Sequence, residues 1–358
     1  MRRIIIIGMC IIVLALAGCA QSAPHPAVKD EPMQTVTDCI GREVSLPENV
    51  DKIAATYSPS GHITVMLGHG TDIVATSNGL QRDKLLHVFC PEITEASVVK
   101  VSGDFNIEEL VALEVDVVFV SYDMYLDEKA MGKLDEMHLP YVVVSFNSIE
   151  EQKQLVRVIA DVLNENDEAQ DYIDFYDRIL SDIGALHETR GEEDVRVYHS
   201  VNEAVNTVGP NSLPEDWMKA AGGIDVSLGG DLTAEEDKYF TTMEQILVWD
   251  PEVILCNVDD TEEYIRTQSA WANIQAVKNG ELYLMPVGIS RWGHTTSTET
   301  PLAIVWTAKM LYPQTFADVD LEALMREFYL ELFEYEVTDE QIAEILNGSG
   351  MRYTKDLE

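Results

Sequence analysis

The chain has 358 residues, with 24 basic and 63 acidic side chains, a formal net charge of −39 and 46% hydrophobic residues. Such a negative balance opposes binding to nucleic acid and to anionic lipid surfaces, although a local pocket can still have either sign. The length suits two domains, each large enough to bury a core.

The N-terminus has the pattern of a secretory leader, with Arg2 and Arg3 followed by an apolar run over residues 4–16. The next residues, Leu16-Ala17-Gly18-Cys19, resemble the lipobox of bacterial and archaeal lipoproteins. That resemblance implies a signal peptide over residues 1–19, lipid on Cys19, and a flexible tether over residues 20–33. We therefore expect a protein anchored by lipid outside the cytoplasmic membrane, in the periplasm or at the cell surface. A plain signal peptide or an uncleaved anchor is the alternative.

Three cysteines follow the lipobox, Cys39, Cys90 and Cys256, and none belongs to a CxxC pair. The sequence therefore indicates no structural zinc site. Cys39 and Cys90 fall in the same half of the chain, so a disulfide between them stays open, whereas Cys256 closes an apolar run and is expected in the core.

The first half of the mature chain alternates short apolar strands with helical segments, which predicts an α/β lobe over residues 34–147. A hairpin is expected over residues 35–46, because apolar residues alternate on both sides of a glycine turn. Further strands are expected at 52–56, 72–76, 115–120 and 142–145.

A long stretch of helical periodicity without proline runs from Ser148 to about residue 188. Ser148 and Glu151 form a capping-box pattern, and the first helix is expected to end near Leu163. Asn166 is expected to cap a second helix that runs through His187. We expect this segment, residues 148–190, to be a strut between two lobes.

A weak internal repeat relates the two sides of this strut, because residues 107–120 and 243–256 align without a gap. Each copy reads as a short helix with glutamate at its second position, then an acidic turn and a buried strand. The repeat predicts a second lobe built like the first, over residues 191–358. The expected fold is α/β, with two Rossmann-like lobes joined by a long central α-helix and a ligand cleft between the lobes.

The second lobe contains an acidic stretch, residues 229–239, which is expected to be a loop. It also contains the most distinctive polar stretch of the chain, residues 288–294, with Arg291, Trp292 and His294 within four residues. Arginine can bind a carboxylate or an oxyanion with two parallel hydrogen bonds, tryptophan can stack on a planar ligand, and histidine can ligate a metal in a chelate. Alternatively, Trp292 packs the lobe and Arg291 pairs with an acidic side chain.

The order of motifs along the mature chain resembles the periplasmic-binding proteins that serve iron–siderophore, haem and cobalamin import. The matching residues are Thr37-Asp38, Gly41-Arg42-Glu43-Val44, Leu46-Pro47, Ser58-Pro59, Leu67-Gly68, Ile73-Val74-Ala75 and Ile107-Glu108 through Val120. The resemblance implies a substrate-binding component of an ABC importer, with a rigid interlobe helix, no intrinsic cofactor and no enzymatic activity. It also implies a monomer that works with a permease dimer and its cytoplasmic ATPase.

Two glutamates, Glu108 and Glu244, occupy equivalent helix starts in the repeat, with Asn106 and Thr241 or Thr242 as expected caps. By the resemblance, these two residues dock on arginines of the permease. Alternatively, each glutamate only stabilises the start of its own helix.

Loops at the carboxyl ends of parallel strands line the ligand crevice in folds of this kind, and by the resemblance the Arg291 loop also faces it. The candidate ligand contacts are polar or aromatic residues in such loops: Tyr57, Ser58, Asn78, Tyr122, Tyr125, Tyr239, Arg291, Trp292 and His294. No direct metal ligand is expected, apart from His294 as an option.

A ferric siderophore is the first expectation for the cargo, because this is the commonest ligand class in the resembled family, and haem and cobalamin are also open. The alternatives are molybdate or tungstate, or a nickel or zinc species. A non-transporting sensor or adhesin on the same fold is more remote. No nucleophile elbow, His-Glu-x-x-His or glycine-rich phosphate loop is present in the sequence, which disfavours an enzyme.

Overall fold

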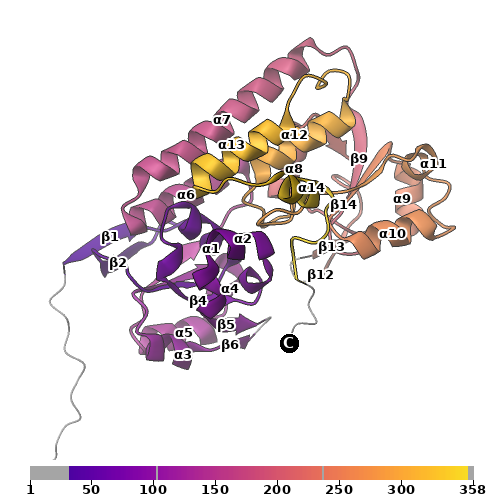
Figure 1. The fold of residues 1–358 in the computed structure, drawn as a ribbon. Helices are drawn as coiled ribbons and strands as arrows, with labels where there is room; N and C mark the ends of the chain where they lie inside the picture. The colour runs from indigo at the N-terminus through magenta and orange to yellow at the C-terminus, as the bar shows by residue number, and fades with distance from the viewer. Residues whose placement is uncertain (1–31, 102–103, 236–237, 354–358) are drawn as a thin grey trace, which may run out of the picture.

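The computed structural model describes residues 32–101, 104–235 and 238–353, which form two α/β lobes flanked by a pair of long helices (Figure 1). The expected leader, Cys19 and most of the tether lie outside the described residues. Within the described ranges, no helix is both long enough and apolar enough to cross a membrane.

The first lobe is built on a six-stranded sheet in which every neighbouring pair is parallel except β5 and β6. Its strands, in spatial order, are β6 (Asp104–Phe105), β5 (Ser97–Val101), β4 (Ile73–Ser77), β3 (Ile53–Ala55), β7 (Val117–Ser121) and β8 (Tyr141–Val144). Strands β3, β7 and most of β8 are buried, which is why they read as continuous apolar runs.

The predicted hairpin is confirmed as β1 (Met33–Thr37) and β2 (Glu43–Pro47), which pair antiparallel. The helices of the first lobe are α1 (Ser58–Met66), α2 (Lys84–Phe89), α3 (Ile107–Leu113), α4 (Tyr122–Tyr125) and α5 (Glu128–Glu136). Its single turns of 3-10 helix are η1 (Gly70–Asp72), η2 (Leu80–Arg82) and η3 (Pro91–Glu95).

The interlobe segment consists of two helices, α6 (Ile149–Leu163) and α7 (Asn166–Thr189), as the sequence predicts. Ser148 Oγ accepts a hydrogen bond from the Glu151 amide at 3.2 Å, and Asn164 adopts a left-handed conformation with φ 63° that ends α6. Asn166 is not the cap of α7 but its first helical residue, preceded by Glu165. Helix α6 packs on α1 and β1 of the first lobe, and α7 packs on helices of the second.

The second lobe is built on a parallel four-stranded sheet in the order β11 (Gly223–Asp225), β9 (Val195–Ser200), β14 (Val253–Cys256) and β15 (Leu282–Leu284). Its helices are α8 (Leu213–Ala220), α9 (Met243–Trp249), α10 (Asp259–Thr267), α11 (Gln275–Asn279), α12 (Thr300–Leu311), α13 (Leu321–Phe333) and α14 (Asp339–Leu346). Helices α12, α13 and α8 cover α7.

The expectation of a plain loop over residues 229–239 is wrong. Strands β12 (Thr233–Glu235) and β13 (Lys238–Phe240) pair antiparallel there, and β13 also pairs with β10 (Asn206–Thr207). The reason is tertiary, because the partner strand β10 comes from a distant part of the chain.

The internal repeat extends to backbone detail. Helices α3 and α9 each have seven residues, begin at a side-chain cap, and end at an acidic residue in the left-handed conformation. The caps are Asn106 and Thr242, as predicted, and the left-handed residues are Glu114 (φ 55°) and Asp250 (φ 42°). Each helix is followed after the same spacing by a fully buried strand, β7 or β14.

The cysteines of the described chain, Cys39, Cys90 and Cys256, are free thiols, so the structure contains no bond between Cys39 and Cys90. Burial raises the pKa of the Cys39 thiol to about 11, which keeps it protonated and unreactive at neutral pH.

Candidate functional site

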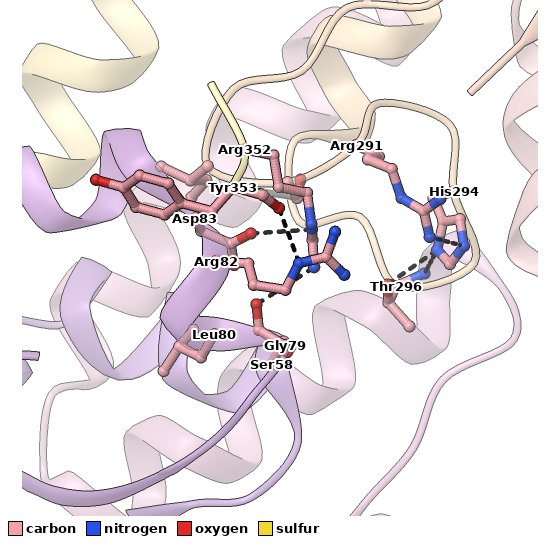
Figure 2. Close-up of polar contacts among 12 residues, drawn as sticks. Ser58, Gly79, Leu80, Arg82, Asp83, Arg291, His294, Thr296, Arg352 and Tyr353 are labelled. Atoms are coloured by element: carbon pink, nitrogen blue, oxygen red, sulfur yellow. Dashed lines mark hydrogen bonds and ion pairs between the residues drawn. The ribbon is translucent and has the colours of Figure 1, made fainter. Parts of the chain in front are cut away.

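Two arginines lie side by side where the first lobe meets the C-terminal end of the chain. Arg82 ends η2, and the next residue, Asp83, forms an antiparallel bridge with Arg352. Arg82 Nε donates to the carbonyl of Tyr353 at 2.9 Å, while Arg352 Nη1 contacts Asp83 Oδ1 at 2.9 Å. Figure 2 shows the two guanidinium groups next to one another.

A third guanidinium, Arg291, comes from the second lobe, on the loop that follows β15 (Figure 2). Its Nη1 donates to Asn202 Oδ1 at 3.0 Å. Burial, together with the nearby charges of Arg352 and Arg82, lowers the pKa of Arg291 to about 9. Figure 2 shows Arg291 of the second lobe on the side of Arg352 and Arg82, and we call these three residues the arginine cluster.

His294 holds the guanidinium of Arg291 in place. Burial and the charge of Arg291 lower the pKa of His294 well below its usual range, so the imidazole is neutral at physiological pH. Its Nε2 is bonded to Arg291 Nη2, and its Nδ1 lies 3.0 Å from Thr296 Oγ1. The Thr296 amide also donates to Nδ1 at 3.3 Å, so the imidazole lies between Arg291 on one side and the Thr296 amide and hydroxyl on the other.

A buried glutamate, Glu299, shapes the loop that carries Arg291. Its carboxylate accepts hydrogen bonds from the Ser290 amide and hydroxyl, both at 2.7 Å, from the Ile289 amide at 3.2 Å, and from the Tyr329 hydroxyl. It has no exposed surface, and burial raises its pKa. Gly288 is required beside it, because a Cβ at that position would lie 1.9 Å from Glu299 Oε1.

A chain of polar contacts starts at Asp83 and links the arginine cluster to both lobes. The Asp83 side chain is only 2% exposed, and its Oδ2 lies 2.9 Å from His62 Nε2 in α1. The other ring nitrogen of His62 lies 3.3 Å from Thr298 Oγ1 in the second lobe. The carbonyl of Thr298 accepts a hydrogen bond from the Tyr172 hydroxyl of α7 at 2.9 Å.

Two of the first-lobe candidates, Ser58 and Asn78, lie next to Gly79, which is a contact of the arginine cluster. Figure 2 shows Ser58 beside Gly79, whose carbonyl accepts a hydrogen bond from Arg352 Nη2 at 3.2 Å. Asn78 immediately precedes that glycine. Ser58 Oγ also lies 3.3 Å from Ser77 Oγ at the carboxyl end of β4.

The aromatic candidates have mainly structural contacts. Trp292 has no exposed surface and belongs to the core, so in this structure its indole presents no face to a ligand. The Tyr125 ring lies 5.0 Å from the Arg42 guanidinium, and the Tyr239 ring packs against Gly209. Tyr57 is half-buried, which raises its pKa, and its ring lies 6.4 Å from that of Phe146. Tyr122 is 43% exposed.

Three members of the site, Arg82, Asp83 and Arg352, are not among the residues predicted from the sequence. Arg82 and Asp83 carry a usable signal, because they follow the carboxyl end of β4 by a few residues. Arg352 has no such signal, since its place depends on how the end of the chain folds back. Within the described residues, no group of three or more His, Cys, Asp and Glu side chains could hold a metal ion.

Comparison with known proteins identifies a family and several structural relatives. The family model described as periplasmic binding protein matches residues 53–287. The molybdate-binding protein MolA of Haemophilus influenzae is 27% identical over 347 residues, covering 89% of this chain and 95% of the relative.

Two solved structures show the same fold. The structure of that MolA protein bound to molybdate has a TM-score of 0.75 at 24% identity and covers 85% of this chain and 99% of the other. The Helicobacter pylori CeuE protein with Ni(II) bound has a TM-score of 0.71 at 19% identity, with coverage of 87% and 99%. At these identities the structural likeness supports the fold alone.

Proposed function

The chain belongs to the periplasmic binding protein family and is a binding component of an ABC transporter, and from that premise we propose that its cargo is a tetrahedral oxyanion such as molybdate or tungstate. The observation that carries this proposal is the arginine cluster formed by Arg82, Arg291 and Arg352. Guanidinium groups bind oxyanions through short, charge-assisted hydrogen bonds, often in parallel pairs.

The charge of the cluster matches a dianion. Three guanidinium groups and the Asp83 carboxylate that contacts Arg352 sum to a net charge of +2, with His294 neutral and with the buried Glu299 carboxylate, which bonds the loop backbone, left out of the count. In a chain whose formal net charge is −39, a local excess of positive charge is the feature that allows an anion to bind. The printed name of the 27% identical relative, a molybdate-binding protein, supports the same ligand class.

The site is less suited to a ferric siderophore, the cargo first expected from the sequence. A large planar or aromatic chelate is held by exposed aromatic faces, and the expected stacking residue, Trp292, has no exposed surface. A bare nickel or zinc ion is also disfavoured, because His294 is occupied by Arg291 and Thr296 and its imidazole lies beside positive charges.

Docking on a permease is the second half of the proposed function. Glu108, whose side chain is 76% exposed, and the exposed Glu244 stand in the first turns of α3 and α9, the two equivalent helices. Each lobe would thus present one carboxylate to an arginine of the permease. The proposed lipid anchor on Cys19 would keep the protein at the membrane where that permease lies.

Titration calorimetry with molybdate and tungstate tests the cargo. We expect one-to-one binding by the unaltered protein and a loss of affinity of about tenfold or more in Arg291→Ala, because a charge-assisted hydrogen bond contributes roughly 1.5–3 kcal/mol. Arg326→Ala is the control, since Arg326 is an ion-paired arginine on α13 that bonds Asp339 and the carbonyl of Val337. Equal affinity in both variants would remove the arginine cluster from the account.

A further inference from the structure

The last described residues of the chain leave the second lobe and bind to the first. We call residues 348–353 the C-terminal strap. The Lys84 amide donates to the carbonyl of Met351 at 3.1 Å, and the Tyr353 amide donates to the carbonyl of Arg82 at 2.8 Å. Lys84 Nζ also donates to the carbonyl of Gly350 at 2.8 Å. A segment that the sequence assigns to the second lobe thus contacts the first lobe.

The strap is fixed on the second lobe at its other end. Gly348 follows α14 with φ 73°, and a Cβ there would lie 2.6 Å from the carbonyl oxygen of Met285. Gly350, two residues later, has φ 95° and open space around it. Two glycines in conformations that other residues rarely adopt thus separate the anchored end from the part that pairs with the first lobe.

Arg352 is held by the strap but keeps hydrogen-bonding capacity. Its Nη1 contacts Asp83 and its Nη2 donates to the carbonyl of Gly79. A guanidinium carries five N–H groups, so these contacts use only two of them. The side chain is 23% exposed, and it lies beside Arg82, at the same positive cluster as Arg291.

Building on the proposed oxyanion cargo, we propose that Arg352 is a ligand-binding residue and that the C-terminal strap is a clasp, which the bound dianion holds against the first lobe. Without Arg352, the anion would lose the N–H donors of one guanidinium group that its contacts to Asp83 and Gly79 leave free, and the cluster would fall to a net charge of +1. The bound anion bonds Arg291 of the second lobe and Arg352 of the strap together, so binding adds a contact that opposes release of the strap.

The test measures molybdate and tungstate affinity in Arg352→Gln, Arg352→Lys and the double variant Asp83→Asn/Arg352→Gln. The double variant removes the buried carboxylate that the single glutamine change would leave without its arginine, so it separates ligand binding from a folding defect. Arg326→Gln is the matched control. Hydrogen–deuterium exchange of peptides covering residues 82–86 and 348–353 is measured for each protein with and without the anion.

We expect Arg352→Gln to lose about tenfold or more in affinity, with partial recovery in Arg352→Lys, which keeps the charge but not the planar fork. The double variant keeps a net charge of +2, so its expected loss of about tenfold comes from the missing guanidinium donors alone. The anion should slow exchange at both peptides in the unaltered protein and not in the glutamine variants. Affinity within threefold of the unaltered protein in both glutamine variants would overturn the clasp while leaving the proposed cargo intact. Failure of the unaltered protein to bind either oxyanion would overturn the proposed cargo and the clasp with it.

Discussion

Replacing Gly288 by alanine should be among the most damaging single-methyl additions to the Arg291 loop. The new Cβ would lie 1.9 Å from Glu299 Oε1 and 2.4 Å from the Tyr329 hydroxyl, whereas real Cβ contacts stay beyond 3.0 Å. The carboxylate would have to retreat by about 1 Å, and Oε1 accepts the bonds from the Ile289 amide and from Tyr329. The loss of two hydrogen bonds to a charged group costs about 3–6 kcal/mol, which is a large part of the free energy of unfolding of a typical protein.

Urea unfolding followed by circular dichroism measures this cost. Gly184→Ala is the matched control, because Gly184 lies on an exposed face of α7 and its added Cβ would meet nothing within 4 Å. The same chemical change should there stabilise the protein by about 0.5–1 kcal/mol. A Gly288→Ala variant within 1 kcal/mol of the unaltered protein would refute the role given to Glu299 in shaping the loop.

Two further predictions concern stability against pH and docking. Burial raises the pKa of Asp225 to about 6 from its ordinary 3.8, so the stability that this group contributes is complete below pH 4 and is lost as the pH rises through 6. Asp225→Asn should therefore be more stable than the unaltered protein at pH 7.5, by up to about 3 kcal/mol. At pH 4 the two proteins should be equally stable, because the amide oxygen of asparagine can still accept from Ser227. A difference in urea unfolding that does not change with pH would contradict this. Glu108→Ala/Glu244→Ala protein should bind its cargo normally but drive uptake into vesicles containing the permease at least tenfold more slowly, and normal uptake would exclude these carboxylates from docking.

Much of the fold is predictable because its signals are local. Ser148 and Asn164 mark the beginning and end of α6 through capping and a left-handed conformation, which are properties of a few neighbouring residues. The repeat that relates α3 and α9 is predictable for the same reason, since each copy carries its own cap, acidic turn and buried strand. The three-stranded sheet of β10, β13 and β12 is not predictable in this way, because its central strand, β13, pairs with β10, a distant segment.

The site is only partly predictable, because burial and long-range pairing decide it. Arg291 and His294 stand out in the sequence as an isolated polar stretch, and the structure brings them together. Trp292 stands beside them in sequence, but the loop directs its indole into the core. Arg352 becomes part of the site only through the return of the C-terminal strap to Asp83, about 270 residues away in the chain by their numbering, and such a pairing leaves no local pattern.

The central claim, an oxyanion cargo, is tested most directly by native mass spectrometry and calorimetry of one protein preparation against a mixed panel. The panel contains molybdate, tungstate, ferric siderophores, haem, cobalamin and nickel–histidine. The account predicts a one-to-one complex with molybdate or tungstate and none with the chelates, because the arginine cluster supplies positive charge and the expected stacking residue, Trp292, is buried. A stable complex with a chelate, in a protein that binds neither oxyanion, would contradict it.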